Sequence, residues 1–229
     1  MNPLIDLVIP AWTDKNGLVK PQKSWQDSGN GLLYSSMLVL LTDLKGDAYR
    51  LVPWIRSKIK ACTYSPGCLK RNPEGSFGQE SWDDYLGVAA ACIVIKDTAI
   101  PRSILLHGFL HFGFFINDKT FDFTQRRWFF PWLKKFSKGF LLLYVHVWAI
   151  MLPAAFPWFK WFFFPLIWAV SKTMEPNLND PGGIQTMWMY LYAAQKIGFH
   201  FDKYDQTKAM LPDALKKYYD LSHPFCSAV

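Results

Sequence analysis

The chain of 229 residues carries 25 lysine and arginine residues against 18 aspartate and glutamate residues, which gives a formal net charge of +7. About half of its residues (51%) are hydrophobic and 17% are aromatic, including 11 tryptophans and 19 phenylalanines. A core of this size normally uses fewer aromatic side chains, so we expect some of them to face lipid, a partner or a ligand. The basic residues are scattered or flank apolar stretches, which disfavours nucleic acid as a partner and favours an anionic lipid surface.

The first residues, MNPLIDLVIPAWTDKNG, contain no basic start, no long apolar run and no small-residue cleavage site, so we expect no signal peptide. The four cysteines are then expected to be free thiols in a reducing compartment. Cys62 and Cys68 bracket a turn, TYSPG, but their spacing is not that of a zinc knuckle. His107 and His111 share a helix face, yet Gly108 replaces the glutamate of H-E-x-x-H. We expect neither a bound metal nor a cofactor.

Apolar residues at helical spacing predict helices over most of the chain. The first covers residues 30–46, with Asn30 as its N-cap and Gly46 as its stop. A second helix is expected over residues 47–62. Residues 63–79 contain two prolines and three glycines, which predicts a loop long enough to be functional. Further helices are expected after Ser81, after Pro101, and over residues 183–198 and 205–221.

Strand-type alternation does not persist anywhere in the sequence, so the predicted fold class is all-α. The arrangement expected is a helical bundle or a partial α/α toroid. We divide the chain into a helical domain (1–135) that contains the polar loop 63–79, an apolar aromatic hairpin (136–175), and C-terminal helices (176–229) that pack back on the first part.

Three acidic residues precede an apolar helix in the stretch SFGQESWDDYLGVAAAC. Ser81 and Asp84 have the S-x-x-D spacing of a helix cap, and the carboxylates lie at the positive end of the helix dipole. Capping leaves part of the cluster without an explanation, namely Glu80 and Asp83 and the aromatic neighbours Trp82 and Tyr85. A binding or catalytic site therefore remains the alternative to a cap.

A similar cluster, SWQDSGNGLLY, precedes the first long helix. If both helix starts lie at one end of the molecule, Asp27 and Asn30 approach the second cluster, with Arg71 from the loop in the same cleft. Acids flanked by tryptophan and tyrosine are typical of carbohydrate sites, in which two carboxylates act as acid and base. Under this alternative the catalytic residues are Asp83, Asp84 and Asp27, and the binding residues are Asn30, Arg71, Trp82, Tyr85 and Glu80.

Residues 139–171 form an apolar stretch that contains a single charge, Lys160. Its length meets the requirement for a membrane span, but prolines at 153, 157 and 165 interrupt it. We therefore expect a re-entrant hairpin or an interfacial segment with its tryptophans at the headgroup boundary. Lysines on both sides of the stretch match an anionic bilayer. A pair of buried core helices is the alternative.

The segments GNGLLYSSMLVLL, SPGCLKRNPEG and ESWDDYLGVAAA resemble a group of uncharacterised tailed-bacteriophage proteins. That group has an NGL helix start, a P-G-L-x-R-x-P loop and an S-x-DDY-x-G helix start in the same order, and the resemblance covers about residues 25–91. Cys68 departs from the loop pattern. Trp82 stands where a histidine is expected, which puts in doubt any role that needs an imidazole there. The resemblance implies a phage origin and no established activity. In layout alone, the motif order is also similar to helical-toroid polysaccharide-degrading enzymes.

These observations lead to two hypotheses of different kinds. The first is a phage-encoded protein that contacts a bilayer, anionic in composition, and acts in the virion or at the host cell membrane as a binding or structural component. Other virion proteins or a polysaccharide would be further partners. The second is a carbohydrate-active enzyme of glycoside hydrolase type that uses the paired carboxylates at the helix starts.

Overall fold

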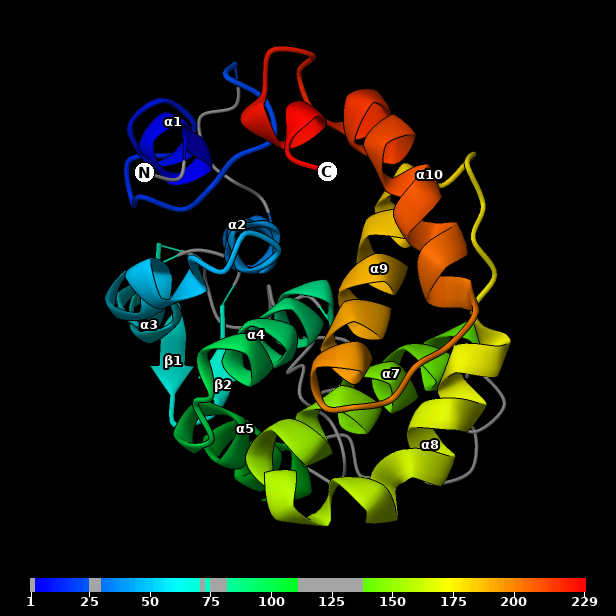
Figure 1. Ribbon diagram of the computed structural model, residues 1–229. Coiled ribbons are helices and arrows are strands. Elements are labelled where there is room, and N and C mark those ends of the chain that lie inside the picture. The colour runs from blue at the N-terminus through cyan, green and yellow to red at the C-terminus, as the bar shows by residue number, and fades with distance from the viewer. Residues whose placement is uncertain (1–2, 25–29, 71–72, 75–81, 111–137) are drawn as a thin grey trace.

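The computed structural model describes residues 3–24, 30–70, 73–74, 82–110 and 138–229, with the backbone alone for residues 138–144. The described chain is mostly helical, as predicted, with one short β-hairpin (Figure 1). Its elements in chain order are α1 (Pro3–Ala11), α2 (Gly31–Asp43), η1 (Ala48–Leu51), α3 (Val52–Ala61), β1 (Thr63–Ser65), β2 (Cys68–Leu69), α4 (Trp82–Ile95), α5 (Ala99–Leu110), α7 (Lys138–Ala155), η2 (Pro157–Phe159), α8 (Lys160–Thr173), α9 (Pro181–Lys196), α10 (Lys203–Tyr218) and η3 (Pro224–Ser227).

Two apolar helices, α2 and α4, form the centre of the molecule. Every residue of α2 from Gly31 to Thr42 is buried, because its sequence is apolar or small on all sides rather than on one stripe. Gly87 of α4 lets the two helices approach closely: a β-carbon there would lie 3.1 Å from the Cα of Leu33. Helix α4 also packs against α7 and α9, so it contacts both halves of the chain (Figure 1).

The described residues share one hydrophobic core. It includes α1 and the C-terminal η3 at one side of the molecule and extends through α2, α4 and α9 to α7 and α8 (Figure 1). The C-terminal helices pack on the first part of the chain, through α9 against α4 and η3 against α1. The apolar hairpin also contributes to this core, through Val147, Ile150 and Met151 of α7 and Ile167 and Val170 of α8.

One local expectation was wrong. The segment at residues 63–79 is not a loop throughout, because Thr63 pairs with Leu69 and Ser65 with Cys68 in an antiparallel hairpin. Its turn residue Gly67 has a φ of +80°, and a β-carbon there would lie 2.1 Å from the carbonyl oxygen of Ser103. The turn therefore packs directly on α5, which pattern reasoning on the loop alone could not indicate. Helix α1 was also missed, since its nine residues form too short a pattern.

The four cysteines are free thiols, as expected. Cys62, Cys68 and Cys92 are buried. Burial raises the pKa of the Cys62 thiol to about 12, and that of Cys92 is also raised. Buried thiols of this kind behave as small apolar side chains.

The apolar hairpin bends at Pro157, whereas Pro153 and Pro165 lie inside helices. The axes of residues 145–155 and 157–173 meet at 111°. Within the described part of the chain, no single helix has the length and hydropathy of a membrane span, and only this bent pair together reaches both.

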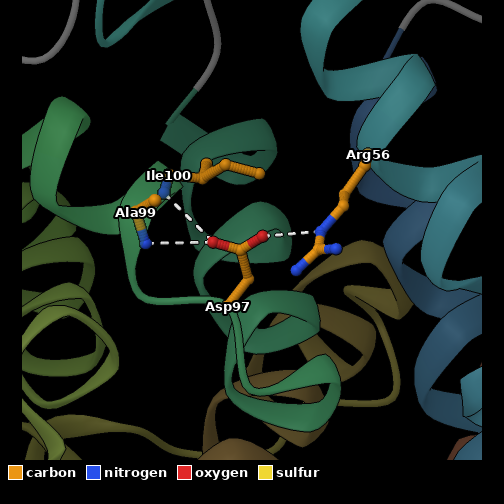
Figure 2. Close-up of polar contacts among 4 residues, drawn as sticks. All are labelled: Arg56, Asp97, Ala99 and Ile100. Carbon is orange, nitrogen blue, oxygen red and sulfur yellow. Dashed lines mark hydrogen bonds and ion pairs between the residues drawn. The ribbon is translucent and has the colours of Figure 1, made fainter.

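The turn between α4 and α5 depends on the carboxylate of Asp97 (Figure 2). Its Oδ1 accepts hydrogen bonds from the amides of Ala99 at 3.0 Å and Ile100 at 3.3 Å, which caps α5. Its Oδ2 lies 2.7 Å from Nε of Arg56 on α3. Lys96, with a φ of +57°, reverses the chain just before this cap. One buried carboxylate thus holds three helices in register.

We expect Asp97→Ala to lower the free energy of unfolding by about 1–2 kcal/mol, because it removes the helix cap and the ion pair together. Asp97→Asn should cost less, since an amide oxygen can still accept from the amides of α5. Chemical denaturation measures both. The control is Asp6→Ala, whose 3.6 Å contact with Arg50 is more exposed. Equal losses for Asp97→Ala and Asp6→Ala would contradict the role assigned to Asp97.

Candidate functional site

The acidic helix start at α4 caps the neighbouring helix α2. The amide of Leu33, in the first turn of α2, donates a 2.9 Å hydrogen bond to Oδ1 of Asp84. Asn30 occupies the N-cap position of α2 but its side chain forms no capping hydrogen bond. Asn30 is thus the N-cap residue, as predicted, but its side chain does not supply the capping bond. The first amides of a helix need acceptors, and at this buried end Asp84 supplies one from outside the helix.

The two helix starts lie together, as the shared-cleft hypothesis required, but the side chains between them are buried. Asp84 is 1% exposed, and Tyr85 is fully buried with its hydroxyl accepting a 2.9 Å hydrogen bond from the Leu69 amide. The hydroxyls of Tyr34 and Tyr218 lie 2.6 Å apart. Burial raises the pKa of Tyr34, and the contact with Tyr218 and the charges of Asp84 and Asp83 raise it further.

These contacts decide how the predicted site residues are placed. Asp84 is buried, whereas the catalytic acid of a glycosidase has to be open to solvent. Asp83 and Asn30 are half-buried. Asp27, Arg71 and Glu80 lie outside the described residues, as does Ser81. The catalytic role of the carboxylates stays a prediction, whereas the capping role of Asp84 is observed.

Trp82 lines a cavity of about 130 Å³ beside the start of α4. The wall of the cavity comes from four segments that are distant in sequence: α4, α7, the α8–α9 connection and the start of α9. We call it the α4–α9 cavity, and its lining residues are Trp82, Leu86, His146, Met174, Glu175, Asn177, Asp180, Gly183, Thr186 and Met187.

His146 is a half-buried polar group of the α4–α9 cavity. Its Nε2 is shielded from solvent and has no hydrogen-bond partner among the described residues, and its ring meets that of Tyr190 edge to face at 5.9 Å. Burial lowers the pKa of His146 to about 4, so the imidazole is neutral at physiological pH.

Two carboxylates stand at the exposed rim of the α4–α9 cavity. Oδ1 of Asp180 accepts a 2.9 Å hydrogen bond from the amide of Gly183 and caps α9. Glu175 and Asn177 precede it in the connection that leaves α8. Within the described chain neither carboxylate forms an ion pair.

Sequence reasoning singled out Trp82, but for a cleft shared with the start of α2, and it missed the polar residues of this cavity. The run NDPGG carried a signal for the cap, because an Asp followed by Pro and Gly is typical of a helix start. His146 carried no such signal, since a single histidine in an apolar stretch does not reveal which segment it faces. No protein-family model, curated protein or solved structure matches this chain, so the function is argued from geometry.

The second candidate site is the outward face of η2 and α8. Helix α8 turns Ile167 and Val170 into the core, as a surface helix does. Its other side is also apolar, where polar residues would be expected. We call this surface the aromatic face; it consists of Trp158, Phe159, Trp161, Phe162, Phe164 and Trp168, all exposed.

The aromatic face continues onto α5. Arg102 donates a 3.0 Å hydrogen bond to the carbonyl of Ala155 at the bend, and its guanidinium lies 5.7 Å from the ring of Phe156. Leu106 and Phe109 follow Arg102 on the same side of α5, at helical spacings of four and seven, and both are exposed. Large exposed apolar side chains gathered in this way are typical of an interaction site.

We expect Asp84→Ala to lower the free energy of unfolding by about 1–3 kcal/mol, because it leaves the buried amide of Leu33 without its acceptor. Asp84→Asn should cost less, since it retains an oxygen acceptor. Asp83→Ala, at the half-buried neighbour, is the matched control and should cost less than Asp84→Ala. Urea denaturation measures all three. An increase in stability on removing Asp84 would instead indicate a site of crowded, repelling carboxylates.

We expect the free energy of unfolding to fall as the pH decreases from 6.5 to 4. Burial lowers the pKa of His146 and of His223 from 6.5 to about 4 in the folded protein, so the unfolded chain binds more protons in this window. Above pH 6.5 both histidines are neutral in the folded and the unfolded chain, so the full free energy of unfolding is retained. As the pH falls to 4, each histidine lowers it by an amount on the order of 1–3 kcal/mol.

Urea denaturation at a series of pH values tests this dependence. His146→Phe should flatten the change between pH 6.5 and 5, whereas His200→Asn, at an exposed histidine of the α9–α10 connection, should not. Equal free energies of unfolding at pH 7 and pH 5 for the unaltered chain would contradict the prediction.

Proposed function

We propose that this protein binds to the surface of an anionic lipid bilayer through the aromatic face of η2 and α8. The observation that carries the proposal is the exposure of Trp158 (86%) and Phe162 (81%) at the bend of a stretch with a single charge. Aromatic side chains of this kind insert at the headgroup boundary, where an apolar ring is favourable and a polar edge can stay hydrated.

An interfacial position is better supported than a span. Helix α8 has 14 residues and is therefore about 21 Å long, shorter than the roughly 30 Å hydrocarbon core. The other arm of the hairpin, α7, buries Val147 and Ile150 in the protein core, and none of its described side chains, at residues 145–155, is exposed. One arm therefore anchors the segment in the protein and the other presents it to the membrane.

The charges near the aromatic face agree with an anionic surface. Nζ of Lys172 lies 5.7 Å from the ring of Trp168 at the end of α8. Nζ of Lys160 donates a 2.7 Å hydrogen bond to the carbonyl of Ile197, which holds its charge beside Trp161. Lysines beside a membrane-inserted aromatic surface are attracted by anionic headgroups.

The sequence resemblance extends the proposal to a phage protein that acts in the virion or at the host cell membrane as a binding or structural component. The carbohydrate-active enzyme has less support, because the central acid of that hypothesis, Asp84, is buried and bonded to a backbone amide.

We expect the full chain to sediment with vesicles that contain phosphatidylglycerol, and less with vesicles of neutral phosphatidylcholine. Replacing Trp158, Phe159 and Phe162 together by serine should reduce partitioning about 100-fold, since roughly 1 kcal/mol of transfer free energy is lost per aromatic side chain. These residues are exposed, so the fold should persist, whereas deletion of residues 139–171 would remove part of the core.

The matched control replaces Tyr49, Tyr64 and Leu221 by serine, at exposed apolar positions outside the aromatic face. It should bind vesicles as the unaltered chain does. The proposal fails if the unaltered chain stays in the supernatant at low salt, or if the two triple variants bind equally.

A further inference from the structure

We infer that the α4–α9 cavity binds a small organic ammonium ion that has an apolar body. The inference depends on which groups of the cavity remain available to a ligand. Leu86, Met174 and Met187 line it with apolar surface, and Trp82 adds an aromatic side chain. The indole of tryptophan is the strongest cation-binding aromatic group in proteins, and thioether side chains adapt to ligands of different shape.

The polar groups of the cavity favour a ligand that donates hydrogen bonds. The hydroxyl of Thr186 already donates to the carbonyl of Gly182 at 3.0 Å, and Oδ1 of Asn177 accepts from the amide of Asn179 at 2.9 Å. Three acceptors are left, the carboxylate of Glu175, Oδ2 of Asp180 and Nε2 of His146, beside the Nδ2 amide of Asn177 as a donor. Carboxylates only accept hydrogen bonds, and a neutral imidazole nitrogen can accept one, so the complement is a group with several N–H donors.

The charge around the cavity selects a cation. Although the chain has a net charge of +7, the described residues that line the cavity include two carboxylates and neither lysine nor arginine. Two described lysines form hydrogen bonds to backbone at or beside the α8–α9 connection: Nζ of Lys203 donates to the carbonyls of Lys172 and Met174, and Nζ of Lys217 donates to that of Leu178 at 3.2 Å.

The size of the cavity limits the ligand. About 130 Å³ is close to the volume of an engineered cavity, roughly 150 Å³, that binds a benzene ring. A six-carbon ring or chain with one ammonium group therefore fills it, with the carbon atoms against the apolar wall and the charge at the rim. This site is separate from the aromatic face, so it does not depend on the membrane proposal.

The experiment compares cyclohexylamine with its neutral isostere cyclohexanol, using saturation-transfer NMR and calorimetric titration of the full chain at pH 7. We expect binding of the amine, and binding of the alcohol that is weaker by roughly fivefold or more because it lacks the charge. The double variant Glu175→Gln, Asp180→Asn should reduce the affinity for the amine to that of the alcohol. Asparagine is as good an N-cap as aspartate, so α9 should remain intact.

The matched control is Asp202→Asn, which removes one negative charge at the N-cap position of α10 and does not line the cavity. It should bind the amine as the unaltered chain does. Filling the cavity with Thr186→Leu should abolish binding of both probes. Equal affinities for amine and alcohol, an unchanged affinity in the double variant, or no binding up to about 30 mM amine, a Kd typical of so small a ligand, would overturn the inference.

Discussion

The amide of Leu33 has to find an acceptor inside the protein, because α2 is buried along its length and water does not reach its first turn. Asp84 provides that acceptor from the start of α4, and Gly87 allows the two helix backbones to come close enough for the bond to form. An unpaired amide at this depth would cost on the order of 1–3 kcal/mol. The bond therefore helps to fix where the first turn of α2 lies relative to the first turn of α4. The positions of the other elements follow from this pair.

Once α2 and α4 are in register, the residues next to Asp84 fall into place. Tyr85 points its hydroxyl at the amide of Leu69 and fixes the hairpin, whose turn at Gly67 then lies against α5. Trp82, two residues before Asp84 and so on the opposite side of α4 from it, lines the cavity together with residues of α7 and α9. The same helix start therefore has a structural side, made by Asp84 and Tyr85, and a side that is available to a ligand.

The apolar stretch at residues 139–171 also has a part that packs in the core and a part that lies at the surface. Pro157 cannot continue the hydrogen-bonding pattern of α7, and the chain turns by 111° at this point. The arm before the bend packs into the core, and the arm after it lies over the surface with Ile167 and Val170 inwards. Burial thus describes the arm before the bend from residue 145 onwards, and the proposal of membrane contact concerns only the arm after it.

The sequence by itself determined the helical class, the approximate extents of the long helices, the free thiols and the importance of the start of α4. These features depend on local periodicity, breaking residues and composition, which one segment displays without its neighbours. It did not reveal that Asp84 accepts a hydrogen bond from the first turn of α2, or that the side chain of Asn30 forms no capping bond. It also could not show that His146, Glu175 and Asp180 join Trp82 around one cavity. Those outcomes required the tertiary structure, because they depend on which distant segments meet and on which polar groups that meeting removes from water.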